Sequence, residues 1–353
     1  MKPLRKFIKA GRIETLGHDD SGVITRAAKA ALEIMSEAKT GNLDITEKAI
    51  ETFGLNILKE LWDDDLGDIE ARKKLRLIGN WIRMCCSTNE QAYRIIEEIN
   101  IGFKARNCHP HDSGEKEAIE AIARYLESKS CKENVIFDVG ANTGEWSSLL
   151  LKTMQNPLVL HIFEPNTTLT EELRKNLLLN TDLASHHRLQ FNEFGISELE
   201  QSTTLFVSNL SNELATIHEL TSRSCYEKIS KQEIKLLRGD QYCKQNAINN
   251  IDLLKIDVEG GELEVLKSFN LNQGEINVSF IQFEYGIANF YAEHGLKDFF
   301  ECFSEDFIFA KLLPEGISIA EKYNNDIEDF EWSNYLGINK REVGFFNFLQ
   351  SQV

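Results

Sequence analysis

The chain has 353 residues, a formal net charge of -17 and a hydrophobic fraction of 42%. This length allows two ordinary domains, or one large domain with an extension. The acidic charge disfavours nucleic acids and anionic membrane surfaces as partners, because their phosphate groups would be repelled.

Seven cysteines are scattered along the chain without a CxxC pair, a usage typical of a reducing compartment. The basic N-terminus is not followed by the apolar core of a secretory signal. No uninterrupted apolar stretch is long enough to span a bilayer. We therefore expect a cytoplasmic protein.

Residues 21–107 are predicted to be helical, because apolar residues recur there at three and four positions, the period of a helix. One such run is Leu75, Ile78, Trp81 and Ile82. These helices are expected to form a core, with a partner-binding or substrate-lid role as the alternative. No catalytic constellation is found among them, so we predict a helical N-terminal region, residues 1–111, of unknown role.

The segment 109–114 combines Pro, Gly and a helix-capping serine, and we place the domain boundary there, with a second domain over residues 112–353. Cys108, His109 and His111 form a Cys/His cluster at this boundary. A structural zinc site would need a second pair of ligands, so a polar loop is the preferred interpretation.

Beyond the boundary, short apolar runs alternate with helical patterns. A helix is predicted at 115–128, followed by strand 135–137, helix 146–154, strand 158–163, helix 170–179, strand 189–194, a hairpin at 205–207, strand 251–256, helix 262–269 and strand 278–283. This alternation predicts an α/β fold with a doubly wound parallel sheet. The runs are continuously apolar, as is typical of strands buried on both faces.

The turn after the first strand reads Asp-Val-Gly-Ala-Asn-Thr-Gly over residues 138–144. Gly140 and Gly144 bracket a tight turn that a helix follows, a place where backbone N–H groups bind a carboxylate. Asn142 stands where the dinucleotide fingerprint needs its second Gly. Asp138 at the strand end suits the amino group of a methionine moiety. A structural turn without a ligand is the alternative.

Glu164 ends the second strand and lies 20 residues after Gly144 (164 − 144). An acidic residue at this place can accept hydrogen bonds from ribose hydroxyls. Together with the turn, it predicts a nucleoside-bearing ligand.

A second acidic cluster follows the fourth and fifth strands. Lys255, Asp257 and Glu259 end the fourth strand, and Glu284 ends the fifth. Neighbouring parallel strands end at the same edge, so we expect these four residues to form the catalytic side of the site, one carboxylate acting as general base. Two alternatives stay open, a structural salt-bridge network and a Mg²⁺ or Mn²⁺ site. The metal is not favoured, because no Asp/His ligand set is present.

Five segments of the chain resemble the FkbM-type methyltransferases, a class I family that uses S-adenosylmethionine. They are Asp138–Gly144, Phe163-Glu164-Pro165, Ser211-Asn212-Glu213, Lys255–Glu262 and Phe283-Glu284-Tyr285. The resemblance covers residues 112–339. It implies a seven-stranded Rossmann-like sheet, S-adenosylmethionine as methyl donor, and O-methylation of a sugar, polyketide or other secondary metabolite.

The resemblance also implies the residues of a cofactor site. These are Asp138, Gly140, Asn142, Gly144 and Glu164, with Asn192 or Glu193 beside the adenine and Glu115 within reach of the cofactor. The chain departs from the family pattern at Glu145-Trp146, where a smaller pair is usual, and at Gly261, where alanine is more frequent.

The expected partner is therefore a small-molecule or carbohydrate acceptor. Two other classes stay open, namely a catalytically silent cofactor-binding or scaffolding protein and an NAD-dependent oxidoreductase. The spacing of the glycines disfavours the oxidoreductase.

Overall fold

A computed structural model describes residues 14–15, 113–129, 133–179, 186–208, 215–218, 229–271, 274–313, 316–328, 330, 332–342 and 344–351. The chain divides into two units, residues 14–107 and residues 1–13 together with 108–353. All described residues except 14–15 belong to the second of these units. The expected N-terminal helices, the Cys108–His111 cluster and the segment 211–213 lie outside the described residues, and the domain boundary stays a prediction.

Strands and helices alternate along the first half of this second unit. In chain order its α-helices and β-strands are α7 (Glu115–Lys129), β2 (Asn134–Val139), α8 (Glu145–Thr153), β3 (Leu158–Phe163), α9 (Thr170–Leu178), β4 (Arg188–Asn192), β5 (Gly195–Ile196), β6 (Gln201–Ser208), β7 (Ala215–Thr216), β8 (Ile229–Leu237), α11 (Gly239–Gln245), β9 (Asn250–Ile256), α12 (Glu262–Ser268), β10 (Asn277–Tyr285), α13 (Ile287–Tyr291), α14 (Leu296–Phe303), β11 (Phe307–Leu313), β12 (Gly316–Ala320), β13 (Ser333–Asn339) and α15 (Gly344–Ser351).

The main sheet runs in the order β4-β3-β2-β9-β10-β13-β11, and β12 continues it beyond β11. Strands β4, β3, β2, β9 and β10 are mutually parallel, whereas β13 is antiparallel to both β10 and β11. The chain leaves β2 towards β3 on one side and returns to β9 on the other. This reversal opens a crevice at the carboxyl ends of β2 and β9, where such sheets bind ligands.

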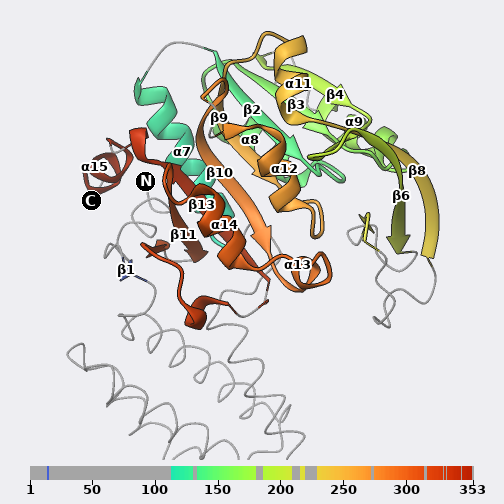
Figure 1. The fold of residues 1–353 in the computed structure, drawn as a ribbon. Helices are drawn as coiled ribbons and strands as arrows, with labels where there is room; N and C mark the ends of the chain where they lie inside the picture. The colour runs from blue at the N-terminus through green and yellow to red at the C-terminus, as the bar shows by residue number, and fades with distance from the viewer. Residues whose placement is uncertain are drawn as a thin grey trace, which may run out of the picture. The chain divides into compact units, whose positions relative to one another are not determined.

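Helices cover both faces of the main sheet (Figure 1). Neighbouring side chains of a strand point to opposite faces, and β2 shows the division. Ile136 packs in the core that includes Ile119 of α7 and Leu150 of α8. Phe137 instead contacts Tyr242 of α11, with ring centroids 5.8 Å apart. The central strands are therefore buried on both sides, and all six residues of β3 are buried.

A second, smaller sheet has the order β5-β8-β6-β7. Its strands β6 and β8 extend beyond the β4 edge of the main sheet at the right of Figure 1. One face carries a small apolar cluster of Leu205, Val207, Ile234 and Leu236. This cluster gives the crevice a second, apolar wall.

The doubly wound, Rossmann-like α/β fold is confirmed. The five expected parallel strands are present with bounds shifted by a few residues, and the third ends at Asn192 rather than at 194. The expected hairpin at 205–207 is part of the smaller sheet. Strands β11, β12 and β13 complete the main sheet and lie outside the strands that the sequence pattern predicts.

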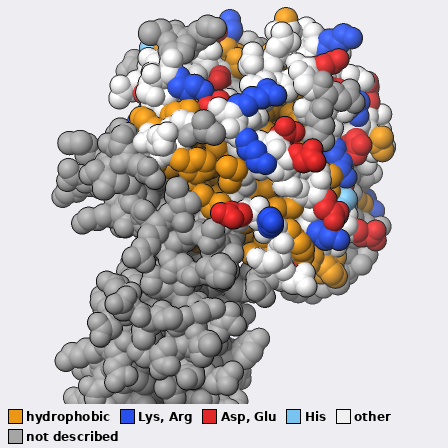
Figure 2. Space-filling model, turned by 60° about the vertical axis from the view of Figure 1, so that its left-hand side comes forward, with side chains coloured by type: hydrophobic (Ala, Val, Ile, Leu, Met, Phe, Trp, Pro, Cys, Tyr) orange, Lys and Arg blue, Asp and Glu red, His pale blue; other side chains and the backbone are white. Residues whose placement is uncertain are grey.

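Acidic and basic side chains alternate on the face in Figure 2 and are not gathered into a patch of one sign. Among the described residues, no helix is both long and apolar enough to cross a membrane.

Candidate functional site

The turn after β2 has a backbone that needs glycine. Gly140 and Gly144 have φ values of 83° and 84°, and Asn142 between them has a φ of 50°. The backbone N–H of Gly140 donates to the carbonyl oxygen of Phe163, 3.0 Å away. A Cβ added to Gly140 would lie 1.7 Å from the carbonyl oxygen of Asp257. The turn therefore packs directly against the loop that follows β9.

Glu164 holds this turn from the neighbouring strand end. Its two carboxylate oxygens accept the backbone N–H groups of Asn142 and Asn166, each at 2.8 Å. Burial raises the pKa of Glu164, and the two N–H groups act in the opposite direction. The side chain is 8% exposed and lines a cavity at this edge of the sheet.

A row of polar side chains crosses three buried strands in register. Asp138 of β2 pairs with Lys255 of β9, which pairs with Gln282 of β10. The Asp138 carboxylate accepts a hydrogen bond from Ser147 at 2.6 Å and lies 3.7 Å from the Lys255 ammonium. Burial raises the pKa of Asp138, while Lys255 and Ser147 lower it. The row fixes the ends of β2, β9 and β10 relative to one another.

Glu115, the first residue of α7, contacts this row through Gln282. It is 4% exposed and accepts hydrogen bonds from Ser113 and Gln282. Burial raises its pKa to about 7, although the charge of Lys255 acts in the opposite direction. A carboxyl group with this pKa changes its charge near neutral pH.

The cavity has a volume of about 530 Å³ and lies between the carboxyl edge of the main sheet and the smaller sheet. This volume is in the range of small-ligand sites. Among the sequence-predicted residues, those that line it are Glu115, Gly140, Asn142, Glu164, Lys255, Asp257, Glu259 and Glu284. The structure thus brings both predicted halves of the site into one cavity.

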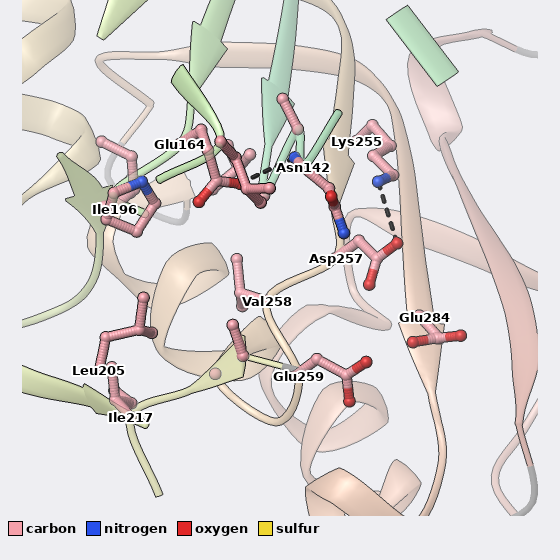
Figure 3. Close-up of a pocket in the computed structure, with 18 of the residues that line it drawn as sticks. Asn142, Glu164, Ile196, Leu205, Ile217, Lys255, Asp257, Val258, Glu259 and Glu284 are labelled. Atoms are coloured by element: carbon pink, nitrogen blue, oxygen red, sulfur yellow. Dashed lines mark hydrogen bonds and ion pairs between the residues drawn. The ribbon is translucent and has the colours of Figure 1, made fainter. Parts of the chain in front are cut away.

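The carboxylates of Asp257, Glu259 and Glu284, here termed the acidic triad, converge within the cavity. Oxygen atoms of the three groups lie within 4.8 Å of one another. The Lys255 ammonium lies 3.1 Å from Asp257. Figure 3 shows the triad on one side of the cavity. Such a group can accept the proton of a hydroxyl or hold a hard divalent cation.

The opposite side of the cavity is apolar, and its residues are absent from the sequence-based site. Figure 3 shows Ile196, Leu205 and Ile217 there, and Ile234 and Leu236 also line it. All belong to the smaller sheet or follow it directly. A signal for them existed in the apolar hairpin at 205–207, which the sequence pattern does not connect to the site.

Four predicted cofactor residues lie behind the cavity wall or beside it. Asp138 is fully buried in the polar row, and Gly144 precedes α8. Asn192 donates to the carbonyl oxygen of Ile162. Glu193 pairs with Arg174 at 3.2 Å and is half exposed. The roles of all four as cofactor contacts stay predictions.

The family model described as methyltransferase FkbM domain matches residues 138–312. Over 213 residues the chain is 25% identical to hexuronic acid methyltransferase AglP of Haloferax volcanii, a match that covers 59% of this chain and 74% of that protein. Over 165 residues it is 27% identical to methyltransferase sdnD of Sordaria araneosa. This match covers 40% of this chain and 62% of that protein.

Solved structures are similar at lower identity. A crystal structure of methyltransferase FkbM from Methylobacillus flagellatus superposes with a TM-score of 0.37 at 14% identity, covering 79% of this chain and 64% of that one. A methyltransferase from Geobacter sulfurreducens superposes with a TM-score of 0.33 at 14% identity, covering 75% of this chain and 96% of that one.

Proposed function

We propose that this chain transfers the methyl group of S-adenosylmethionine to a hydroxyl group of a sugar or secondary metabolite. Residues 138–312 belong to the methyltransferase FkbM domain family, and this membership supports methyl transfer. The methyl donor would supply an electrophilic methyl group bound to a sulfonium. The protein's own residues bind and orient the two reactants and remove the proton of the acceptor.

The turn from Gly140 to Gly144 is the observation that carries the proposal. It lines the cavity, and its backbone comes so close to Asp257 that a Cβ has no room. The residues Gly140 to Thr143 line the cavity, and the small side chains of the first two leave their backbone open to close approach by a ligand. Helix α8 follows the turn and offers free N–H groups with a partial positive charge, which suit the carboxylate of a methionine moiety.

Glu164 and the apolar wall support a nucleoside next to this turn. Glu164 follows β3 directly, and its carboxylate would accept hydrogen bonds from the two ribose hydroxyls. Pro165, Ile196 and Leu236 lie along the same side of the cavity and would contact the adenine ring. An adenine has large apolar faces, so burial against these side chains favours binding.

The acidic triad supports transfer to a hydroxyl. An alcohol must lose its proton as the new bond forms, which requires a general base within hydrogen-bond reach. Asp257 is the preferred base, because its backbone contacts the Gly140 turn and its side chain would therefore lie next to a methyl donor bound at that turn. Glu284 comes second and Glu259 third.

Ligand-induced stabilisation tests the cofactor. S-adenosylmethionine and S-adenosylhomocysteine should each raise the Tm of the full chain, since binding to the folded state alone adds about 2.7 kcal/mol at a hundredfold excess over Kd. NADH should not. The substitution Glu164→Gln should weaken binding about ten- to hundredfold, whereas Glu171→Gln, on the exposed side of α9, should leave it unchanged. Stabilisation by NADH alone would contradict the proposal.

Labelled methyl groups test the acceptor. The chain is incubated with methyl-labelled S-adenosylmethionine and a panel of hexuronic acids, neutral sugars and hydroxylated metabolites. Label should appear on an oxygen of one of these compounds. Tight binding of the cofactor with no transfer to any hydroxyl, in the panel or in an extract, would instead support a silent cofactor-binding protein.

A further inference from the structure

The acidic triad is assembled from two segments, the loop after β9 and the end of β10. Asp257 and Glu259 follow β9, and Glu284 lies near the end of β10. Three carboxylates within 4.8 Å repel one another. An arrangement of this kind needs other contacts to hold the two segments together, and residues that do not line the cavity provide them.

Glu262 binds the loop after β9, here termed the first loop (residues 257–261). It begins α12, is 1% exposed, and does not line the cavity. Its Oε1 accepts the backbone N–H groups of Val258 at 3.0 Å and Gly260 at 3.1 Å, and its Oε2 also lies 3.1 Å from the Gly260 nitrogen. Burial raises the pKa of Glu262 to about 7, although the backbone N–H groups act in the opposite direction.

Asn289 connects Glu262 to the end of β10. It is 1% exposed in α13, and its Nδ2 donates to Oε2 of Glu262 at 2.6 Å. Its Oδ1 accepts the backbone N–H of Gly286 at 2.8 Å. Gly286 follows β10 directly and lies two residues after Glu284. A continuous set of hydrogen bonds therefore joins the two segments that carry the triad.

The first loop is held in a conformation that it would not adopt alone. Glu259 has a φ of 55°, in the left-handed region that side chains disfavour. A Cβ added to Gly260 would lie 2.9 Å from the carbonyl oxygen of Ala288 in α13. Thr216 of the smaller sheet donates to the carbonyl oxygen of Glu259 at 2.8 Å. Such a backbone persists where its surroundings determine it.

We propose that Glu262 and Asn289 are positioning residues, which place the carboxylates of the acidic triad for methyl transfer without touching either reactant. The inference rests on the proposed function of the cavity. Helix capping accounts for the contact between Asn289 and Gly286 at the start of α13, but not for the hydrogen bond between Asn289 and Glu262, which connects α13 to the start of α12.

The donor and acceptor pattern of the pair permits a sharp test. In Glu262→Gln one carboxylate oxygen is replaced by an NH₂ group, which can only donate. If this group faces Asn289, it meets the NH₂ group of Asn289. If the side chain turns over, it meets the N–H groups of Val258 and Gly260 instead. In Asn289→Asp two carboxylates meet in a buried place. The double substitution makes the pattern complementary again, because the new amide donates to the new carboxylate while its oxygen still accepts from the loop. Each single variant should therefore be impaired and the double variant restored.

Hydrogen exchange of the full chain, at a pH above 7, reads the loop directly. The amides of Val258 and Gly260 should exchange about ten- to hundredfold faster in Glu262→Gln and return towards wild-type rates in the double variant. With an acceptor found in the labelling screen, kcat should fall and recover in the same order. The Kd for S-adenosylhomocysteine should change much less than kcat, because Glu164 holds the Gly140 turn through hydrogen bonds that involve neither Glu262 nor Asn289.

Glu342→Gln is the matched control. Glu342 is 6% exposed and accepts hydrogen bonds from Tyr125, Lys129 and Ser279 at the opposite end of β10. Its loss should lower Tm and change neither the two amide rates nor kcat.

Three outcomes would overturn the inference. They are unchanged amide exchange in Glu262→Gln, a double variant as impaired or unfolded as the single variants, and a loss of S-adenosylhomocysteine affinity parallel to that of kcat. If no acceptor is methylated, the proposed function fails, whereas the exchange rates still decide whether the pair holds the two segments.

Discussion

Lys255 carries its charge inside the protein, where it is 5% exposed. Burial disfavours the charged form, but the carboxylates of Asp257, Asp138 and Glu115 together hold its pKa above the usual value. A buried charge of this kind is tolerated only when it is paired and hydrogen-bonded. Removing one of these carboxylates therefore changes the charge balance around Lys255.

Glu115→Gln should make the stability of the protein less dependent on pH. The pKa of Glu115 is raised from 4.5 to about 7 in the folded protein. Its stabilising effect is therefore complete below pH 4.5 and is lost as the pH rises to 7. An amide does not titrate, so the free energy of unfolding of the variant relative to wild type should rise over this range, by up to about 3 kcal/mol.

Urea unfolding without ligand at several pH values between 4.5 and 8 measures this difference. A difference that stays constant with pH would show that Glu115 is ionised throughout.

Asp257→Asn should separate catalysis from binding. Loss of a general base costs roughly 10²- to 10⁴-fold in rate. The variant should bind S-adenosylmethionine nearly normally and transfer methyl groups at least about a hundredfold more slowly. Glu171→Gln, which changes an exposed acid of α9 outside the cavity, is the control and should retain full activity. Near-normal turnover in Asp257→Asn would assign Asp257 a structural role.

A chelator separates a base from a metal ligand in the same assay. If chelation abolishes methyl transfer and Mg²⁺ restores it, the acidic triad holds a cation. Activity that survives chelation favours the general base.

Site residues could be predicted from the sequence where they directly follow a predicted strand. The places of Gly140, Glu164 and Asp257 in one cavity follow from the parallel sheet, because its strands end at a common edge. The partners of these residues could not be predicted in the same way. Asn289 binds Glu262 across 27 residues of chain, and nothing in the local pattern indicates that contact.

Some strands could be predicted from the sequence and others could not. The buried parallel strands are predicted by continuous apolar runs, and β3 agrees with its predicted bounds. Strand β13 is also wholly buried, yet it contains Asn334, Gly337 and Asn339, residues that strands generally disfavour. Strand β8 alternates exposed Lys235 with buried Leu236, a pattern of half-buried strands that gives no hint of a cavity wall. Tertiary contacts decide these strands.

Gly140→Ala tests the turn between β2 and α8 as an element. A methyl group there would lie 1.7 Å from the Asp257 carbonyl oxygen and would also require a φ of 83°. Either the turn or the loop after β9 must move, so we expect a loss of stability of more than about 2 kcal/mol and a loss of cofactor binding. The measurements are urea unfolding and titration with S-adenosylhomocysteine.

Gly274→Ala is the matched control for the turn. Gly274 has a φ of 75° but nothing within 4 Å of an added Cβ. It should lose only about 1 kcal/mol for the left-handed backbone and bind the cofactor normally. Equal effects of the two substitutions would show that backbone strain, and not the contact with Asp257, makes Gly140 necessary.

At the scale of the whole molecule, the described lining of the cavity comes from one unit. Its residues run from Glu115 to Trp332 and belong to the main sheet, its loops and the smaller sheet. The helical pattern of residues 21–107 predicts helices, but it does not predict which other part of the chain they contact.

A shortened chain that begins at Asp112 should therefore still bind S-adenosylmethionine. The polar row, the Gly140 turn, Glu164 and the apolar wall all lie after that point. Its Kd for S-adenosylhomocysteine, measured by calorimetry, should agree with that of the full chain to within about threefold, or about 0.7 kcal/mol. The Tm can fall independently of the Kd, because the cavity residues and the residues removed are different. A folded shortened chain that does not bind the cofactor would show that the N-terminal residues complete the site, and a chain that binds the cofactor but no longer methylates the acceptor would assign them to acceptor binding.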